Sequence, residues 1–474
     1  MTPSTTRSST SPLALALQSA FMVILASATL ALGTGCGNTY RPVVSAINPV
    51  GPAAQPEKFA VAISTTGTAA HPTPGLVTFV DFSGDTVLVT ANIGVNPYYL
   101  VLNSGGNTGF TLNSDRTLST FDISTSLLQS QILQTTLLPG ADPVSIFPAS
   151  SSTYVTDPGL NAVSQFTGQP LNLQQQLSID PAFIPIYVTG NAAAPRDFVL
   201  SQRVGGGLGQ VSTIEAASNT IDPNPIPVGR DPVYGIMTGD NRRAFILNQT
   251  DGTVSVINAQ TNQLDTVPVG ATNPIPVGVS PLWADFAPTR NEMVVANAGD
   301  SVHPGSLSIV SIPLCSANAL PINPNCDPNN PVDAVGFGTV LATVPTGIES
   351  VMVSVLQDGT RAYVANQGDL TLPCALPPAV PGVSTVCSVS VINLTTNTLV
   401  RTLYSLPDSQ CLASNGTLCG HPAYIAATTG TPTGKVYIVS KDSQFMSVIR
   451  TDTDTVDVTI PLQGTGVSVR VTAP

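Results

Sequence analysis

In this sequence of 474 residues, the spacing of the cysteines is the pattern that indicates the most specific chemistry. Six of the seven cysteines fall in three close pairs: Cys315 with Cys326, Cys374 with Cys387, and Cys411 with Cys419. Each pair brackets a stretch rich in Pro, Asn or Gly, so joining neighbours closes the shortest loops and costs the least conformational entropy. We therefore expect three local disulfides, each contributing about 2–3 kcal/mol to stability. Metal binding is the weaker alternative because no Cys-x-x-Cys spacing is present, and we predict neither a metal nor any other cofactor.

The seventh cysteine, Cys36, ends an N-terminal segment with the features of an export signal. Arg7 is the only charged residue before it, residues 13–32 are mostly apolar, and residues 33–35 are Gly-Thr-Gly. Small residues before a cysteine resemble the bacterial lipoprotein cleavage box, although Gly33 stands where that box usually has an aliphatic residue. We expect removal of residues 1–35, acylation of Cys36 and anchoring in a cell-envelope membrane, facing the periplasm or the exterior. An uncleaved anchor and an ordinary signal peptide are the alternatives.

After residue 57 the chain contains a repeated strand unit, and these repeats must position the cysteines. The clearest repeated unit is Val-Ser-Val-Ile-Asn at 254–258, which recurs at 389–393 and, as Met-Ser-Val-Ile-Arg, at 446–450. Looser copies begin at Val77, Leu118, Val163, Val211 and Leu307. Alternation of apolar residues with Ser or Thr predicts strands. The copies are 41 to 57 residues apart, except for one step of 82 that contains two cysteine pairs, and such a period suits one four-stranded propeller blade per repeat.

Eight copies predict an all-β fold, a single β-propeller of eight four-stranded blades over residues 58–474, with seven blades as the alternative. Residues 36–57 are rich in Pro, Ala and Gly, which suits a tether between membrane and fold. The first repeat starts at Lys58 without an innermost strand, and the last strand, 466–471, has no repeat of its own. We expect this strand to complete the first blade, with Val467, Val469 and Val471 burying one face. Closure of the ring would remove an exposed sheet edge.

One strand in several repeats nearly spells a known motif, as at 154–157 (Tyr-Val-Thr-Asp) and 363–366 (Tyr-Val-Ala-Asn). These residues resemble the Tyr-Val-Thr-Asn-repeat (YVTN, WD40-like) β-propeller family over about residues 58–474. The resemblance implies a propeller in which two sets of loops share one face around a central channel. These are the loops leading into the innermost strands and those joining the second and third strands. It implies no particular activity, because one propeller scaffold serves many functions.

Seven polar side chains fall in the loops of that face and are candidate contacts for a ligand. They are Asp142, Arg230, Asp231, Glu349, His71, His303 and His421. The alternative for each is turn chemistry, because a residue before Pro favours an extended approach to the strand. The histidines come from the first, sixth and eighth blades, so no shared metal is predicted. Trp283, the only tryptophan, falls in an innermost strand and is interpreted as core, and Asn248, Asn297 and Asn366 as caps of the next turn.

No catalytic residue is predicted, because the sequence has no Gly-x-Ser-x-Gly, His-Glu-x-x-His or phosphate-binding glycine motif. A net charge of −12 without any cluster of Lys and Arg argues against a nucleic-acid partner. We therefore expect an extracytoplasmic binding or scaffold module for a protein, a glycan or a small molecule, touching the membrane only through its lipid anchor. The alternative is a propeller enzyme, lactonase-, lyase- or quinoprotein-like, with its site at the channel mouth. Only 9% of residues are charged, which leaves few titratable groups for such chemistry.

Overall fold

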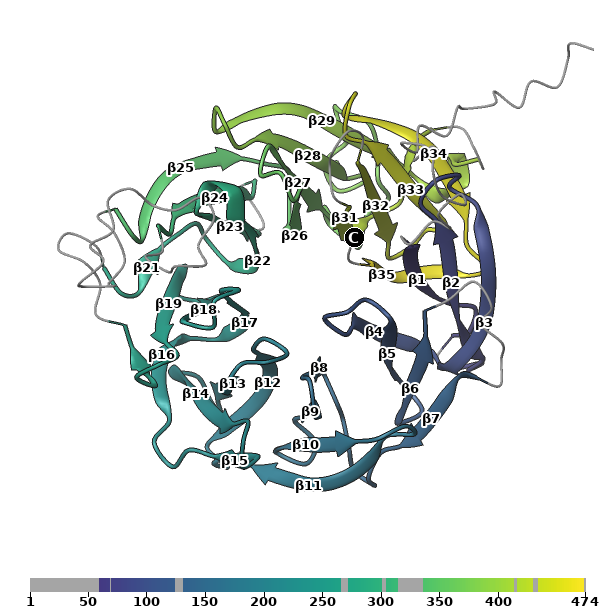
Figure 1. Cartoon of the computed structure of the whole chain (residues 1–474). Helices are drawn as coiled ribbons and strands as arrows, with labels where there is room; N and C mark the ends of the chain where they lie inside the picture. Colours follow the sequence, from purple (N-terminus) through teal and green to yellow (C-terminus); the bar gives the residue numbers. More distant parts are fainter. Residues whose placement is uncertain are drawn as a thin grey trace, which may run out of the picture. The chain divides into compact units, whose positions relative to one another are not determined.

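The computed structural model describes residues 59–68, 70–123, 131–265, 272–300, 304–313, 336–412, 416–428 and 434–472. In these residues the chain forms eight sheets arranged around one axis (Figure 1), a β-propeller of eight blades as the repeats predict. The predicted signal segment and tether, with Cys36, lie outside the described residues, as do Lys58, His303, Cys315 and Cys326. Within the described residues, no helix is both long and apolar enough to cross a membrane.

Each of the first four blades has its strands in order from the axis outwards. The first comprises β35 (Thr465–Val471), β1 (Phe59–Thr65), β2 (Pro74–Asp81) and β3 (Val87–Val95). The second comprises β4 (Pro97–Leu102), β5 (Thr108–Asn113), β6 (Thr117–Asp122) and β7 (Leu133–Thr136). The third comprises β8 (Ser145–Pro148), β9 (Thr153–Asp157), β10 (Ala162–Thr167) and β11 (Asn172–Ser178). The fourth comprises β12 (Phe183–Thr189), β13 (Arg196–Arg203) and β14 (Leu208–Glu215), which pairs with the short strands β15 (Thr220–Ile221) and β16 (Ile226–Arg230).

The remaining four blades follow the same plan. The fifth comprises β17 (Pro232–Met237), β18 (Arg243–Asn248) and β19 (Thr253–Asn258), which pairs with β20 (Gln263–Leu264) and β21 (Ile275–Pro276). The sixth comprises β22 (Pro281–Ala287), β23 (Glu292–Asn297), β24 (Ser306–Ser311) and β25 (Thr339–Pro345), with a 3-10 turn, η2 (Pro288–Arg290), between β22 and β23. The seventh comprises β26 (Ser350–Val355), β27 (Arg361–Asn366), β28 (Ser388–Asn393), β29 (Thr398–Leu406) and β30 (Leu418–Cys419), with a second 3-10 turn, η3 (Asp408–Gln410), between β29 and β30. The eighth comprises β31 (Pro422–Ala427), β32 (Lys435–Ser440), β33 (Phe445–Arg450) and β34 (Thr455–Pro461).

The core lies between neighbouring blades, so the middle strands of a blade are covered on both faces. All six residues of β18 are buried, whereas six of the seven residues of the outermost strand β11 are exposed. Phe245 and Val254 of the fifth blade, for example, share one cluster with Met293 and Val310 of the sixth. Burial on both faces explains why the middle strands read as apolar runs and the outer strands as polar ones.

A buried amide ties the second strand to the third in several blades. Asn248 Nδ2 donates to Ser255 Oγ over 2.9 Å, and Asn366 Nδ2 donates to Ser390 Oγ over the same distance. Asn297 makes the equivalent bond to its third strand over 3.0 Å. The acceptor is the Ser of the repeated unit, which explains why Ser recurs at that position. Each amide also bonds to the first residue of the third strand, so it spans the turn between the two strands as predicted and reaches further across the sheet.

Two of the three predicted disulfides lie in the described residues, and both are formed. Cys374 is bonded to Cys387 in the loop between β27 and β28, and Cys411 is bonded to Cys419 ahead of the eighth blade. Their sequence separations of 13 and 8 residues agree with the expectation of local pairing.

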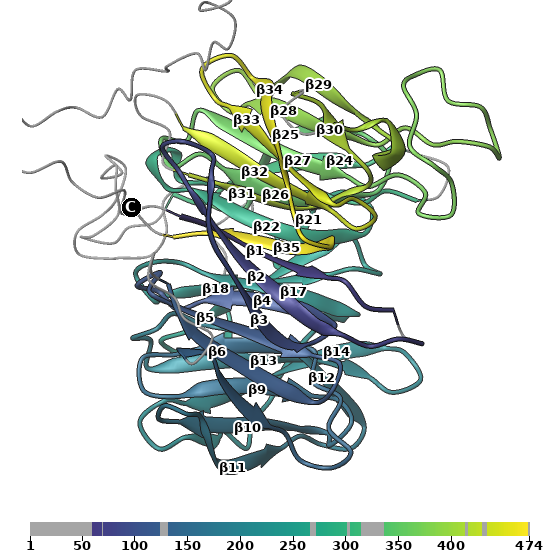
Figure 2. The same ribbon diagram turned by 90° about the vertical axis from the view of Figure 1, so that its right-hand side faces the viewer.

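The C-terminal strand closes the ring. β35 pairs antiparallel with β1, with Ala60 opposite Val471 and Ala62 opposite Val469, and the two strands lie side by side in Figure 2. The register shifts by a β-bulge between Ile63 and Ser64. Val467 therefore packs on the side of the second blade, while Val469 and Val471 pack on the side of the eighth. The prediction that the three valines share one face is wrong, because the bulge reverses the alternation.

Deletion of residues 465–474 tests this closure. The shortened chain loses the β35 ladder and the burial of Val469, so we expect a sharp fall in melting temperature and aggregation through the freed edge of β1. The loss of stability should exceed the roughly 0.5–3 kcal/mol typical of a point substitution. Circular dichroism and light scattering measure both effects, and deletion of residues 37–50 should change neither. An unchanged melting curve after the C-terminal deletion would contradict the closure.

One buried carboxyl group departs from the repeat. Asp197 is the second residue of β13 and is 1% exposed, whereas Ala244, Ala362 and Val436 hold the equivalent place in β18, β27 and β32. Neither carboxylate oxygen of Asp197 has a hydrogen-bond partner in the described part of the chain. Burial raises the pKa of Asp197 to about 7 from its ordinary 3.8. The folded ring is therefore destabilised wherever this group is ionised.

The substitution Asp197→Asn measures that cost. The folded pKa lies above the unfolded one, so the stability linked to this group is complete below the unfolded value and is lost as the pH rises through about 7. We expect Asp197→Asn to raise the free energy of unfolding at pH 8 by up to roughly 4 kcal/mol and to change it little at pH 4. Urea unfolding at both pH values is the measurement, with the exposed-site variant Asp122→Asn as control. Equal effects of Asp197→Asn at the two pH values would refute the assignment.

Candidate ligand site at the axis of the ring

The innermost strands of six blades begin with the same irregularity, a β-bulge. In β4, Pro97 pairs with Asn113 and Tyr99 with Leu112, so that Tyr98 is the extra residue. The same shift follows Pro185, Pro232, Pro281, Ser350 and Pro422. The residues after the six bulges hold one register position, and we call them the axial tier: Tyr99, Tyr187, Tyr234, Trp283, Met352 and Tyr424. Five of the six are therefore aromatic.

The chain reaches four of these bulges through a residue in the left-handed region, with φ between 42° and 56°. These residues are Asn96, Asp231, Ser280 and Glu349. The extended approach predicted for Asp231, which precedes Pro232, is therefore wrong, and the conformation is uncommon for Ser and Glu. Gly229, two residues before Asp231, leaves no room for a side chain, because a Cβ would lie 2.6 Å from Asn248 Cγ. The side chain of Asn248, in the second strand, therefore leaves room only for a glycine at position 229.

The aromatic rings of the axial tier contact one another around the axis. The ring centroids of Tyr187 and Tyr234 lie 5.1 Å apart, and Tyr234 stacks on Trp283 at 4.1 Å. The hydroxyls of Tyr99, Tyr187 and Tyr234 lie near enough for each to influence the pKa of the next. These residues come from β4, β12, β17 and β22, innermost strands that surround the axis in Figure 1. Tyr99, Tyr187 and Trp283 nevertheless remain partly exposed, so solvent reaches the tier.

Arg470 of β35 reaches this row of rings from the first blade. Its Cζ lies 5.8 Å from the centroid of the Trp283 ring, within the range of a cation–π interaction. Arg470 Nη1 donates to the carbonyl oxygen of Val469 over 3.0 Å. No carboxylate of the described residues forms an ion pair with the guanidinium, whose side chain is partly exposed. Among the described residues, the positive charge of the tier therefore has no carboxylate as an ion-pair partner.

The tyrosine hydroxyls around Arg470 stay protonated. Burial raises the pKa of Tyr99 and Tyr187 well above the ordinary value, and it raises those of Tyr234 and Tyr424 as well. The charge of Arg470 acts in the opposite direction on all four groups, but its effect is smaller. The four phenols can therefore donate hydrogen bonds to a ligand as neutral groups.

A carboxyl group also lies near the tier. Asp285, two residues after Trp283 in β22, accepts the backbone N–H of Val355 over 2.8 Å and that of Phe286 over 2.9 Å. Burial raises the pKa of Asp285 to about 6, although both hydrogen bonds lower it. A group that titrates near neutrality can give or take a proton. The axis thus combines a guanidinium, aromatic faces, phenol hydroxyls and a titratable acid.

Several of the predicted ligand contacts are exposed or bonded to residues outside the axial tier. Asp142, Arg230 and His71 are exposed, and Arg230 pairs with Asp251 at 2.5 Å. Asp231 accepts a hydrogen bond from the hydroxyl of Thr250. His303 lies outside the described residues.

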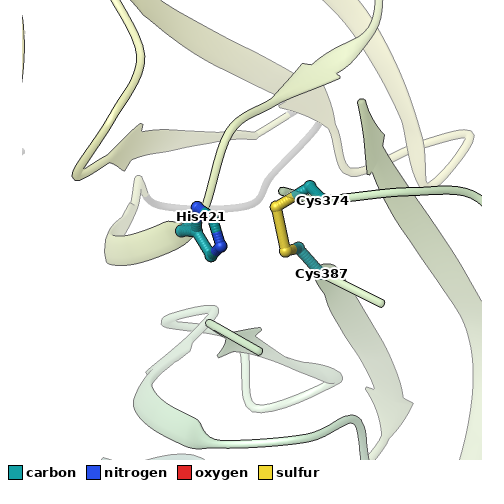
Figure 3. A group of neighbouring side chains, drawn as sticks. All are labelled: Cys374, Cys387 and His421. Carbon is teal, nitrogen blue, oxygen red and sulfur yellow. A yellow bond between two sulfur atoms is a disulfide. The ribbon is translucent and has the colours of Figure 1, made fainter. Parts of the chain in front are cut away.

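Glu349 and His421 lie at the junction of the seventh and eighth blades. Glu349 is partly buried, and burial together with the charge of Asp369 raises its pKa. His421 is 3% exposed and lies beside the Cys374–Cys387 disulfide (Figure 3). Its Nε2 lies 3.3 Å from the carbonyl oxygen of Asp369, so Asp369 links the two predicted residues.

Arg470 is not among the residues that the sequence predicts for the site, and Trp283 is predicted to lie in the core. Trp283 does pack against three hydrophobic clusters, but its other face lies in the axial tier. A signal was present, because Pro-x-aromatic occurs at the start of five innermost strands, at 97–99, 185–187, 232–234, 281–283 and 422–424. Each proline by itself indicates only a turn, and the aromatic residue two positions later becomes a signal only when the repeats are aligned.

Comparison with known proteins supports the architecture. No protein-family model matches the sequence, and no curated protein sequence matches it. Among solved structures, the chain is similar to apo AztD from Citrobacter koseri, with a TM-score of 0.56 and 10% identity over 87% of this chain and 97% of that one. It is also similar to the dihydro-heme d1 dehydrogenase NirN, with a TM-score of 0.56 and 12% identity over 90% of this chain and 78% of that one. What is shared is the propeller fold. Function must therefore be argued from the site.

Proposed function

We propose that this chain is a binding protein whose ligand, an organic anion with a flat apolar part, lies against Arg470 in the axial tier. The observation that carries the proposal is the guanidinium of Arg470, partly exposed and surrounded by aromatic rings. Guanidinium groups bind carboxylate and phosphate groups through paired hydrogen bonds. Aromatic rings at the same place favour a ligand that can stack on them.

The way the tier is built supports binding by a preformed site. The six residues of the tier come from six different blades. Arg470 comes from β35, the strand that completes the first blade. Each residue stands on a strand rather than a loop, next to a second strand whose residues are mostly buried. A ligand that meets fixed groups loses less free energy to ordering the protein.

We also propose that the protein acts outside the cytoplasm, anchored through Cys36, and that the family it resembles is the YVTN-repeat propellers. Support for the location comes from the small residues before Cys36 and from the two disulfides, which persist mainly in oxidising compartments. Support for the family comes from the motifs at 154–157 and 363–366, which form β9 and most of β27.

Asp285 favours a second candidate function, a propeller enzyme with its site at the axis. Its pKa of about 6 suits a general acid or base, and Arg470 and the phenols would stabilise negative charge on a substrate. The variant Asp285→Asn separates the two functions, because a binding protein keeps its affinity for the anion whereas an enzyme loses turnover.

Trp283 is the only tryptophan of the chain, so its fluorescence reports directly on the tier. We expect benzoate to change the emission saturably and benzamide, which has the same shape without charge, to leave it unchanged. Arg470→Gln should weaken benzoate binding at least tenfold, because a hydrogen bond to a charged group contributes about 1.5–3 kcal/mol.

The control for this titration is Arg450→Gln, which removes a guanidinium from a surface ion pair with Asp452 at 2.6 Å. This variant should bind benzoate as the parent chain does, and thermal unfolding establishes that the ring of each variant is intact. Equal affinity in the parent and Arg470→Gln would refute the assignment. The same conclusion would follow if benzoate, cinnamate and phenyl phosphate all failed to give a saturable change.

The anchor is tested by the intact mass of the chain extracted from the membrane fraction. We expect Cys36 to be the new N-terminus and to carry acyl chains, while Cys36→Ser should move the protein out of that fraction. A mature N-terminus elsewhere, with Cys36 removed or unmodified, would overturn the lipoprotein proposal without affecting the axial site.

A further inference from the structure

A cysteine pair and an imidazole meet between the seventh and eighth blades. The Sγ atoms of Cys374 and Cys387 and an imidazole nitrogen of His421 all lie within 4.8 Å of one another. All three side chains are buried, with exposed fractions of 2%, 0% and 3%. The two sulfur atoms and the histidine ring face each other in Figure 3. The sequence predicts no metal here because the cysteine spacing does not suggest one, and the histidine comes from a different blade.

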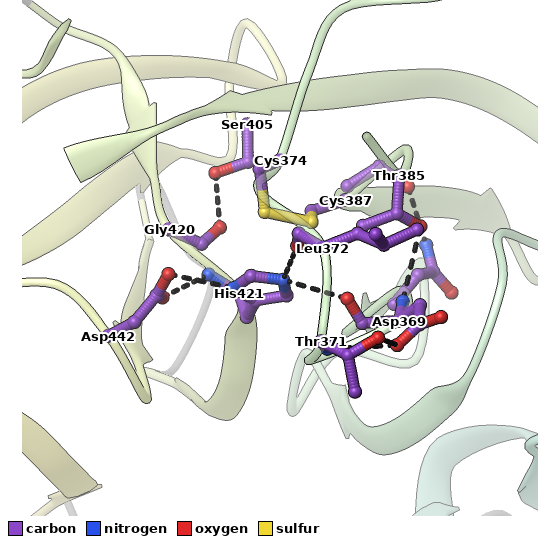
Figure 4. The surroundings of a disulfide bond; sticks show 12 residues. Asp369, Thr371, Leu372, Cys374, Thr385, Cys387, Ser405, Gly420, His421 and Asp442 are labelled. Atoms are coloured by element: carbon purple, nitrogen blue, oxygen red, sulfur yellow. Dashed lines mark hydrogen bonds and ion pairs between the residues drawn. A yellow bond between two sulfur atoms is a disulfide. The ribbon is translucent and has the colours of Figure 1, made fainter. Parts of the chain in front are cut away.

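His421 is held as metal-binding histidines are held. Its Nδ1 lies 2.8 Å from Asp442 Oδ2, and its backbone N–H donates to Asp442 Oδ1 over 2.7 Å (Figure 4). A carboxylate on one ring nitrogen fixes the imidazole and leaves the other nitrogen to act as a ligand. In the oxidised chain that other nitrogen, Nε2, donates to the carbonyl oxygens of Leu372 over 3.0 Å and Asp369 over 3.3 Å, in the loop that carries Cys374, so a metal would have to replace these bonds.

The loop keeps the two cysteines together by contacts other than the disulfide. Cys374 and Thr385 form an isolated parallel bridge. The backbone N–H of Ala375 donates to Thr385 O over 2.8 Å, and that of Thr385 donates to Pro373 O over 3.0 Å. The Cα atoms of the two cysteines lie 5.4 Å apart. Reduction would therefore leave two thiols side by side next to His421.

We propose that Cys374, Cys387 and His421 form a redox-gated site for a thiophilic divalent cation such as Zn²⁺. A dithiol reductant opens the disulfide, is itself oxidised to a disulfide, and transfers two electrons and two protons to the cysteines. Binding of the cation releases both thiol protons and the proton of Nε2, and breaks the hydrogen bonds of Nε2 to the carbonyl oxygens of Leu372 and Asp369. Two metal–sulfur bonds and one metal–nitrogen bond form, and water takes the fourth position of the tetrahedron. Reoxidation of the pair removes both thiolate ligands and releases the metal.

Co²⁺ tests the site, because its thiolate charge-transfer and d–d bands report sulfur ligands in a tetrahedral geometry. The chain carries Cys36→Ser, Cys315→Ser and Cys326→Ser, so that only the two described cysteine pairs remain. After reduction with dithiothreitol and its removal under nitrogen, we expect one Co²⁺ per chain with a thiolate band. The oxidised chain should show no band, and reoxidation of the loaded chain should abolish it.

Matched variants assign the ligands. His421→Ala should lose the band, and Asp442→Asn should weaken Co²⁺ binding about 10- to 100-fold by freeing the imidazole. The double variant Cys411→Ser/Cys419→Ser is the control, because that pair belongs to no such group in the described residues, and it should bind as before. Melting of the oxidised variants shows that each ring is folded. A reduced chain without a band, a band that survives His421→Ala, or one that disappears in the control would overturn the proposal.

Discussion

The pairing of β35 with β1 is the interaction on which the rest of the molecule depends. It joins segments at opposite ends of the propeller, as the hydrogen bond from Phe59 N to Thr472 Oγ1, 413 residues away, illustrates. The pairing gives the first blade its innermost strand and buries Val469. It also places Arg470 at the axis, 5.8 Å from the Trp283 ring of the sixth blade. Ring stability and the proposed binding site therefore share one strand, and neither is complete until the last residues of the chain have folded.

Six of the other seven blades make the axis suitable for a ligand through a repeated local irregularity. A bulge at the start of an innermost strand adds one residue and turns the next side chain. In six blades that side chain is Tyr, Trp or Met. The turn before the bulge needs a glycine because the asparagine of the neighbouring strand, Asn248 for Gly229, fills the space. That asparagine in turn bonds to Ser255 of the repeated unit, so one chain of contacts runs from the repeat to the site.

Sequence reasoning predicted the architecture because the signal is periodic. Eight copies of one strand unit, with a last strand that belongs to none of them, are enough to predict eight blades and their closure. Alternation failed at Val467 because a bulge adds one residue and cannot be read from a pattern of period two. The site was missed for a related reason. Arg470 lies in the strand without a repeat, and His421 approaches Cys374 and Cys387 from another blade, so neither relation is local in sequence.

Binding of an anion at Arg470 can be observed in a crystal structure of the protein with 4-bromobenzoate, recorded at the bromine absorption edge. We expect one anomalous peak among Tyr187, Tyr234 and Trp283, with the carboxylate on the Arg470 guanidinium. Bromine found only elsewhere on the ring, with Arg470 contacting nothing but the protein, would contradict it.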